Sequence, residues 1–183
     1  MKTKNIIMTG IFAALMIISS YIVVPIGVVP HTLQPLIVLL SGILLGPKYG
    51  PLSIIVWIIL GCLGLPVFNQ GQAGVGMLFG PTGGFIVSFI VGSGVAGYLT
   101  EHSSNKSLGR NIAYMVFSML VIYVVGAIGF MFNFTYFLNK PMTWEKTFIL
   151  AVAPFLPFDI IKAVIAAYVG GKVRKSLIAA GQL

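Results

Sequence analysis

Long apolar runs with almost no charge constrain the fold of this chain more than any other feature of its sequence. A helix needs about 20 mostly apolar residues to cross a bilayer, and such runs recur between short polar connections. Hydrophobic residues make up 58% of the 183 residues and charged residues only 8%, whereas about a quarter of a soluble domain is charged. The sequence therefore predicts an all-α integral membrane protein with a single membrane domain, residues 1–183.

Six transmembrane helices are expected from the apolar runs. They cover residues 5–24, 34–45, 51–65, 81–99, 111–132 and 147–169. The second and third are shorter than a full span, so tilt or incomplete crossing is expected there. Pro154 and Pro157 interrupt the last region because proline removes a backbone donor, which predicts a short helical piece, a break, and a final helix from about Phe158. No A-x-A cleavage pattern follows the first run, so it is interpreted as a retained helix.

The distribution of basic residues predicts the orientation, because cytoplasmic loops carry an excess of Lys and Arg. Lys140 and Lys146 would lie on one side of the membrane, and Lys162 falls within the last helix. The other bases would share the opposite side: Lys2, Lys4, Lys48, Lys106, Arg110, Lys172, Arg174 and Lys175. Both termini are therefore expected in the cytoplasm, and a ligand site near the extracellular side is expected at the start of the last helix.

Asp159 and Lys162 are the charged residues that most need an explanation. Of the three acids in the chain, Asp159 is the one predicted inside an apolar segment. A charge near the bilayer centre costs about 2.5–3.5 kcal/mol on insertion scales. The i, i+3 spacing puts both side chains on one helix face, and Pro157 suits the first turn of a helix, where the dipole favours an anion. A ligand site that uses both charges is the hypothesis, and an ion pair that only orders the helix is the alternative.

The connection 65–84 is uncharged and rich in glycine. Glycine allows backbone to approach a ligand closely and to adopt positive φ, so this connection either folds over a small molecule or is a flexible connector. The candidate binding residues here are Phe68, Asn69, Gly74, Gly76, Gly80, Thr82, Gly83 and Gly84. Thr32 and Gln34 lie on the same predicted side, although Gln34 alternatively only caps a helix or orients a loop.

Several other functions are excluded by missing motifs. Gly80-Pro81-Thr82-Gly83-Gly84 lacks the Gly-Lys-Ser/Thr ending of a phosphate loop, so the chain alone is not expected to bind ATP. The single cysteine, Cys62, allows no intrachain disulfide. No His, Asp or Glu cluster has metal-ligand spacing, and no nucleophile has an evident base. We therefore expect no enzyme activity, no metal and no cofactor, and the scattered bases argue against nucleic-acid binding.

The motifs together resemble the BioY-type biotin-binding S components of energy-coupling-factor vitamin transporters. The matching segments follow the family order across nearly the whole chain: Pro30-His31-Thr32-Leu33-Gln34, Leu44-Leu45-Gly46-Pro47, Gly64-Leu65-Pro66-Val67-Phe68, Gly80-Pro81-Thr82-Gly83-Gly84-Phe85 and Leu156-Pro157-Phe158-Asp159-Ile160-Ile161-Lys162. The resemblance implies a six-helix subunit that captures biotin on the outer face and translocates it. Phe158 departs from the family, which commonly has glycine there.

The resemblance also implies roles for individual residues. Asp159 would accept the ureido N–H groups of biotin, and Lys162 would donate to a ureido or carboxylate oxygen of the ligand. The loop 68–84 would close over the ring system, with Thr32, Gln34, Asn69 and Tyr136 at the rim. A transmembrane coupling subunit and two ATPases would supply the energy, and the small residues Gly10 and Ala14 would form the docking surface for them. The alternative function is a structural or regulatory membrane protein whose Asp159–Lys162 pair only fixes helix packing.

Overall fold

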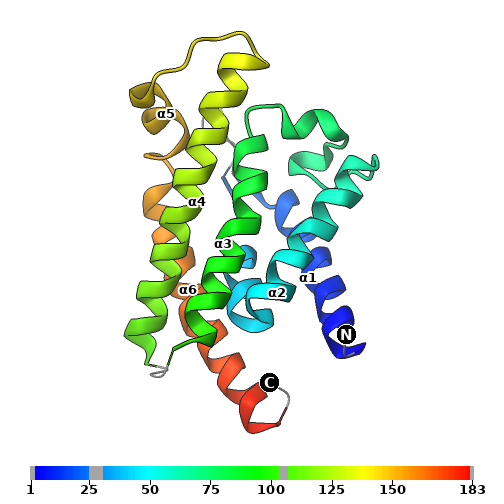
Figure 1. Ribbon diagram of the computed structural model, residues 1–183, viewed down its shortest axis with the longest axis vertical. Coiled ribbons are helices and arrows are strands. Elements are labelled where there is room, and N and C mark those ends of the chain that lie inside the picture. The colour runs from blue at the N-terminus through cyan, green and yellow to red at the C-terminus, as the bar shows by residue number, and fades with distance from the viewer. Residues whose placement is uncertain (1–2, 25–30, 104–106, 182–183) are drawn as a thin grey trace.

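The computed structural model describes residues 3–24, 31–103 and 107–181, and within them the chain is a bundle of helices (Figure 1). The helices are α1 (Thr3–Tyr21), α2 (Gln34–Cys62), α3 (Gly83–Glu101), α4 (Leu108–Tyr136), α5 (Trp144–Ala151) and α6 (Leu156–Ala179). Two short strands, β1 (Val23–Val24) and β2 (His31–Thr32), and two 3-10 turns, η1 (Asn69–Gly71) and η2 (Val75–Leu78), complete the fold. The predicted helical class is therefore confirmed in its coarse form, a mostly helical chain.

Helix α2 is a hairpin of two helical arms that turn at Gly46. Gly46 has φ 76° and ψ −176°, which is not helical. A Cβ placed on Gly50 would lie 2.9 Å from the Ser41 carbonyl oxygen and 3.1 Å from the Gly42 Cα. Residues eight apart in a straight helix are separated by about 12 Å along its axis, so the two arms run side by side. The arms correspond to the second and third predicted helices, and α2 begins at the predicted residue, Gln34.

The other helix bounds differ from the predicted ones by a few residues, except at the C-terminus. The last predicted helix ended at residue 169, whereas α6 continues to Ala179. The break near Pro154 lies where it was predicted, because α5 ends at Ala151, α6 begins at Leu156, and the two helices are bent by 60°. The bases Lys172, Arg174 and Lys175 consequently lie on a helix instead of in a tail.

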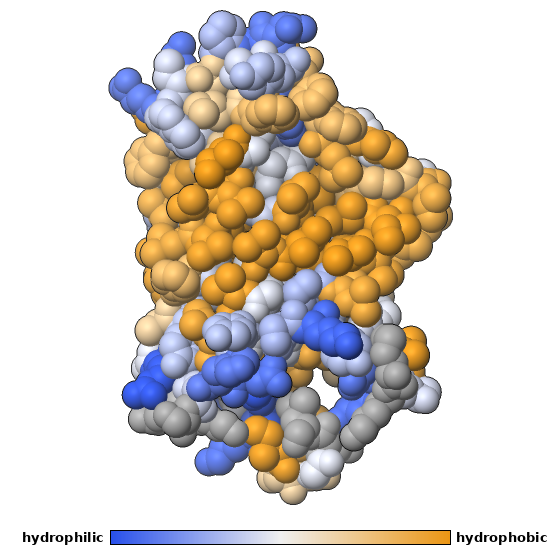
Figure 2. All heavy atoms as spheres, in the orientation of Figure 1, coloured by the Kyte–Doolittle hydropathy of each residue, from blue (hydrophilic) through white to orange (hydrophobic). Residues whose placement is uncertain are grey.

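The exterior suits a bilayer. In the described part of the chain, four helices are long and apolar enough to cross a membrane (α1, α2, α3 and α4), and α5 with α6 makes a fifth candidate if the bent pair is one span. Figure 2 shows a broad band of apolar side chains across the middle of the visible face, with hydrophilic residues toward both ends. The start of α1 and the end of α6 lie toward one end of the molecule, and α5 lies at the other (Figure 1). Lys2 and Lys106, which entered the orientation argument, lie outside the described residues.

Close backbone approaches hold α3 between its neighbours. A Cβ on Gly84 of α3 would lie 2.5 Å from the Phe130 nitrogen of α4. At the other end of α3, a Cβ on Gly97 would lie 2.5 Å from the Pro47 nitrogen at the turn of α2. Small residues of this kind let membrane helices pack closely. These approaches keep the bundle narrow at α3, where one side of the candidate site is built.

The connection from α2 to α3 is tied to the bundle by side-chain donors. Ser20 Oγ and Trp57 Nε1 both donate to the Val67 carbonyl oxygen, each at 2.9 Å. Farther along, Asn133 Nδ2 on α4 donates to the carbonyl oxygens of Leu78 at 2.8 Å and Gly80 at 2.9 Å. Backbone carbonyls without water need such partners. These hydrogen bonds hold the connection against α1, α2 and α4.

Candidate functional site

The start of α6 places one acid and one base in the interior. Pro157 lies in the first turn of α6, where a missing N–H breaks no helical hydrogen bond. Asp159 lies in the same turn, and Lys162 lies about one turn farther on. Asp159 is only 4% exposed and Lys162 only 9%. A buried charge needs a partner and further hydrogen bonds, so the surroundings of this pair decide what it can do.

Asp159, Lys162 and Tyr123 form one hydrogen-bonded network. Lys162 Nζ donates to Asp159 Oδ1 at 2.6 Å, and the Tyr123 hydroxyl on α4 donates to Asp159 Oδ2 at 2.6 Å. Lys162 Nζ also donates to the Thr32 carbonyl oxygen at 2.7 Å. Each carboxylate oxygen keeps a further lone pair, and an ammonium has three donors. The network therefore retains the capacity for one more acceptor and additional donors from a ligand.

Strand pairing and ring stacking position the Thr32 carbonyl. Val23 of β1 pairs with Thr32 of β2 in an antiparallel register. The adjacent His31 ring stacks on Phe155 with a centroid separation of 3.9 Å, and its Nε2 lies 3.0 Å from the Pro154 carbonyl oxygen. Since a carbonyl can only accept, His31 Nε2 carries the proton. These contacts fasten the chain before α2 to the break before α6.

The network opens on a narrow cavity between the helices. The cavity volume is about 50 Å³, and every helix except α1 contributes to its wall. Aromatic and aliphatic side chains form most of the wall, namely Phe85, Ile86 and Phe89 of α3, Ile122 of α4, Ala151 of α5, and Phe155 and Pro35. The polar side chains on the wall are Thr32, Gln34, Asn69, Thr82, Tyr123, Asp159 and Lys162. Ligand pockets typically combine an apolar wall with a few placed polar groups.

Three polar atoms of the cavity-lining side chains have no hydrogen-bond partner within the described residues. They are Gln34 Nε2, Asn69 Oδ1 and Thr82 Oγ1, and all three are buried. The other end of the Gln34 amide is held, because Thr32 Oγ1 donates to Gln34 Oε1 at 3.2 Å. An unpaired buried polar atom costs about 1–3 kcal/mol, and native structures contain few of them. Their presence around one cavity favours the binding of a polar molecule there.

The structure brings together about half of the residues predicted for the site. Thr32, Gln34, Asn69, Thr82, Asp159 and Lys162 line the cavity. Phe68 lies outside it, packed edge-on against Trp57 with 1% of its surface exposed. Tyr136 is 68% exposed near the end of α4.

The predicted glycines do not line the cavity. Gly74 lies in the left-handed region with φ +96°, so it serves a turn, and Gly76 and Gly80 belong to the same connection. Gly83 and Gly84 are buried in the first turn of α3, where Cβ atoms would meet the Leu78 carbonyl and the α4 backbone. Gly10 and Ala14 are both exposed on α1, and a Cβ on Gly10 would meet nothing within 4 Å.

Sequence reasoning missed Tyr123 and the aromatic wall. Tyr123 is 36 positions from Asp159, so no local spacing connects the two residues. One signal was available, because a buried phenol needs a partner for its hydroxyl and Tyr123 lies in the middle of an apolar run. Phe85, Phe89 and Phe155 carry no such signal, since aromatic residues are common throughout membrane helices. Among the described residues there is no group of three His, Cys, Asp or Glu side chains that could hold a metal.

An apolar exterior around a buried cavity with charged and amide groups defines the class of protein: a multi-pass membrane protein with a small solute cavity between its helices. A comparison with protein families narrows this class. Residues 1–179 match the model of the BioY family. The chain belongs to the BioY family, and it is therefore a transport protein and not an enzyme.

Two relatives and one solved structure agree with this assignment, and a more distant structure shares the fold. The chain is 37% identical to the biotin transporter BioY of Thermotoga maritima, covering 94% of this chain and 96% of that protein. It is also 37% identical to the probable biotin transporter BioY of Pyrococcus horikoshii, covering 95% and 98%. A crystal structure of the S component for biotin from an ECF-type ABC transporter matches with a TM-score of 0.81 at 30% identity, covering 95% of this chain and 92% of that one. The folate-bound FolT structure, at 16% identity and a TM-score of 0.62, shares the fold.

Proposed function

We propose that this protein binds biotin with high affinity and carries it across the membrane as the S component of a vitamin uptake transporter. The observation that carries the proposal is the cavity wall, where the buried Asp159–Lys162 pair lies beside three buried polar atoms without partners. The names of the relatives support the choice of biotin. Biotin offers two ureido N–H donors, a ureido carbonyl, a thioether ring and a carboxylate, which need both polar and apolar contacts.

In the proposed complex, two charged side chains and two amide side chains hydrogen-bond to the polar groups of biotin. Asp159 accepts from the ureido N–H groups, and Lys162 donates to a ligand oxygen. Gln34 and Asn69 supply the further donors and acceptors, while Phe85, Phe89 and Phe155 surround the ring system. A cavity of about 50 Å³ has room for only a few water molecules. Biotin is larger, so side chains or the 68–84 connection must move when it enters.

The proposed topology has six membrane crossings, with both termini in the cytoplasm and the biotin site near the extracellular side. The two arms of α2 supply two crossings, and α1, α3, α4 and the α5–α6 pair supply the others. Arg110, Lys172 and Lys175 belong to the end of the bundle opposite α5, while Lys140 and Lys146 belong to the α5 end. This asymmetry matches the positive-inside rule.

We also propose a transmembrane coupling subunit and two ATPases as partners, with Gly10 and Ala14 on the docking surface. Both residues are exposed, and the Gly10 position is open, so a partner helix can approach α1 closely. Replacing Gly10 or Ala14 by Leu is expected to abolish co-purification with the coupling subunit and leave biotin binding intact. Unchanged co-purification of the coupling subunit with both variants would contradict this docking surface.

Calorimetric titration of the detergent-purified chain tests the proposed ligand. Biotin is expected to bind with a submicromolar Kd, desthiobiotin more weakly because it lacks the thioether ring, and unrelated vitamins not at all. The cavity variant Asn69→Ala should weaken biotin binding, and the control variant Gln72→Ala, which removes an exposed amide outside the cavity lining, should not. Biotin binding weaker than micromolar, or equal binding of folate, would overturn the proposal.

A further inference from the structure

A second cavity lies at the end of the bundle opposite the biotin site. It is formed by the end of α3, the start of α4 and the last turns of α6, and its volume is about 630 Å³. The bases Lys172, Arg174 and Lys175 all line it, and none of its lining residues within the described part of the chain is acidic. Polar groups of Thr100, Ser107, Asn111 and Tyr168 and the apolar residues Leu108, Ala167, Gly171 and Ile178 complete the wall. The proposed biotin site uses none of these three bases, and the positive-inside rule accounts for their side of the membrane but not for their grouping around one cavity.

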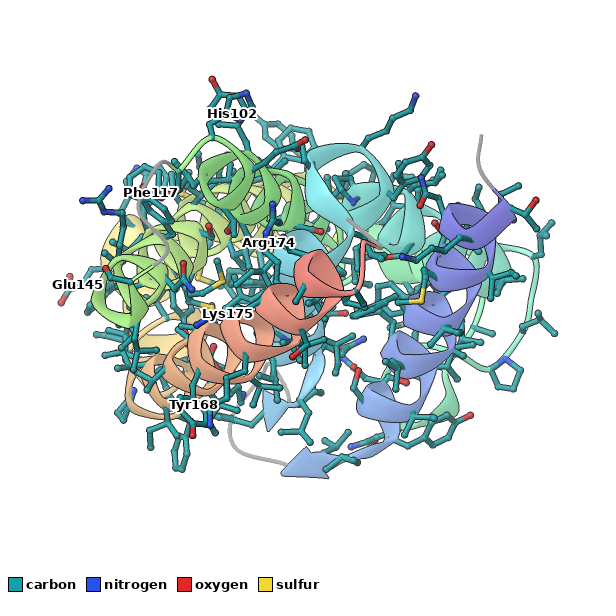
Figure 3. The ribbon with its side chains drawn as sticks, turned by 90° about the horizontal axis from the view of Figure 1, so that it is seen from below. His102, Phe117, Glu145, Tyr168, Arg174 and Lys175 are labelled. Carbon is teal, nitrogen blue, oxygen red and sulfur yellow. The ribbon has the colours of Figure 1, made fainter. Side chains whose placement is uncertain are left out.

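Arg174 is held inside this cavity by a fixed contact. Its Nη1 donates to the Ile43 carbonyl oxygen on α2 at 2.7 Å, and its buried Nε has no partner within the described residues. Figure 3 looks onto this end and shows Arg174 directed from α6 toward α2 and α3, with Lys175 beside it on the same helix. A guanidinium held in place by one carbonyl keeps further N–H donors for an anion.

The two lysines are more accessible than Arg174. Lys172 and Lys175 are exposed, and Lys172 Nζ donates to the Tyr168 hydroxyl at 2.6 Å. Glu101, at the end of α3, interacts electrostatically with Arg174 but does not line the cavity. It offsets one of the three positive charges at most, so the cavity keeps a net positive charge.

We propose that this cavity binds a phosphoryl group. Phosphate oxygens suit the planar donors of arginine and the point charges of lysine. A phospholipid head group is one source, because the cavity lies beyond the apolar band at the membrane surface, where basic pockets between helices recognise anionic lipids. Its apolar wall residues suit the glycerol and upper acyl region of such a lipid. Free phosphate is the other source.

The test compares two pairs of charge-neutralising variants of the full chain. Lys172→Gln with Lys175→Gln removes two cavity bases and leaves the Arg174–Ile43 contact intact. Lys140→Gln with Lys146→Gln is the matched control, since it removes the same charge from exposed positions at the other end. Circular dichroism and size-exclusion elution establish that both variants keep the helical fold.

One arm of the experiment measures lipid retention. Each protein is placed in nanodiscs of equal parts phosphatidylglycerol and phosphatidylethanolamine, and native mass spectrometry reports which lipids stay bound. The wild type should retain phosphatidylglycerol preferentially. In the cavity variant this preference should fall by about twenty-five-fold, since each of the two bases near a membrane surface contributes about fivefold. The control should keep the wild-type preference.

The other arm measures binding of inorganic phosphate to delipidated protein in detergent by phosphorus NMR. Phosphate binding that the cavity variant loses and the control keeps supports the site with a soluble ligand. Cavity-dependent lipid retention supports it with a lipid ligand. The proposal is overturned if neither probe distinguishes the two variants, because the lysines then act only through the overall surface charge.

Discussion

The role of the Asp159–Lys162 pair can be tested by replacing Lys162 alone and then by replacing Lys162 together with Asp159 and Tyr123. Lys162 Nζ and Asp159 Oδ1 are 2.6 Å apart, with side chains 11% and 5% exposed. Lys162→Met leaves Asp159 with the Tyr123 hydroxyl as its donor. Breaking a buried pair in this way costs about 3–5 kcal/mol of stability. The midpoint of thermal unfolding in detergent should therefore fall sharply in this single variant.

A combined variant separates stability from binding. Replacing Asp159 by Leu, Lys162 by Met and Tyr123 by Phe removes all three polar side chains of the network at similar volume and leaves only the Thr32 carbonyl oxygen without its lysine donor. Such an apolar replacement of a buried pair is often neutral or stabilising. Biotin would lose at least two hydrogen bonds to charged groups, each contributing about 1.5–3 kcal/mol. The sum of about 3–6 kcal/mol corresponds to a roughly hundredfold to ten-thousandfold weaker Kd.

Thermal unfolding and calorimetric titration on the same preparations provide the assay. We expect the combined variant to unfold near the wild-type midpoint and to bind biotin at least a hundredfold more weakly. Wild-type affinity in a stable combined variant would refute the reasoning, because the charges would then serve only helix packing. That outcome would favour the structural alternative for Asp159 and Lys162.

Three smaller perturbations follow from the contacts around the site. Tyr123→Phe should lower stability by about 1.5 kcal/mol or more, since it removes a hydrogen bond to Asp159, and thermal unfolding checks this against wild type. Asn133→Ala should speed amide hydrogen exchange in residues 78–80, because two carbonyls lose their donor; unchanged exchange would contradict its role in holding the connection. Gly84→Ala should destabilise by about 1–3 kcal/mol through overpacking, whereas Gly10→Ala, in open space, should be neutral or stabilising.

The features that the sequence predicts correctly depend on local chemistry. Apolar length and the missing donor of proline are local properties, so the break before α6 and the start of α2 at Gln34 could be located. The two arms of α2 were also predicted as two separate helices, and the chain turns between them at Gly46, which has a positive φ. The extension of α6 through Lys172 and Arg174 was missed because the predicted end followed the apolar run. Lysine and arginine interrupt such a run, but both residues favour helix.

The residues that the sequence does not reveal depend on tertiary contact. Tyr123 meets Asp159 because α4 and α6 pack together, and nothing within either helix encodes that partnership. The same holds for Arg174 and the Ile43 carbonyl, which are 131 positions apart. A charge within an apolar run therefore predicts a site from the sequence, while the groups that contact that charge become visible only when the helices are placed beside one another.

The glycines of the 65–84 connection have two different structural roles that their sequence alone does not separate. A turn with positive φ and a close helix contact both require the absence of a Cβ, so the sequence cannot distinguish them. Gly74 has the first role and Gly84 the second. The second role still shapes the site, because Gly84 brings α3 against α4 immediately before Phe85, whose ring rests on Gly126. Phe85 lines the same cavity as Tyr123, so the close contacts at Gly84 and Gly126 help to position one residue of the cavity wall.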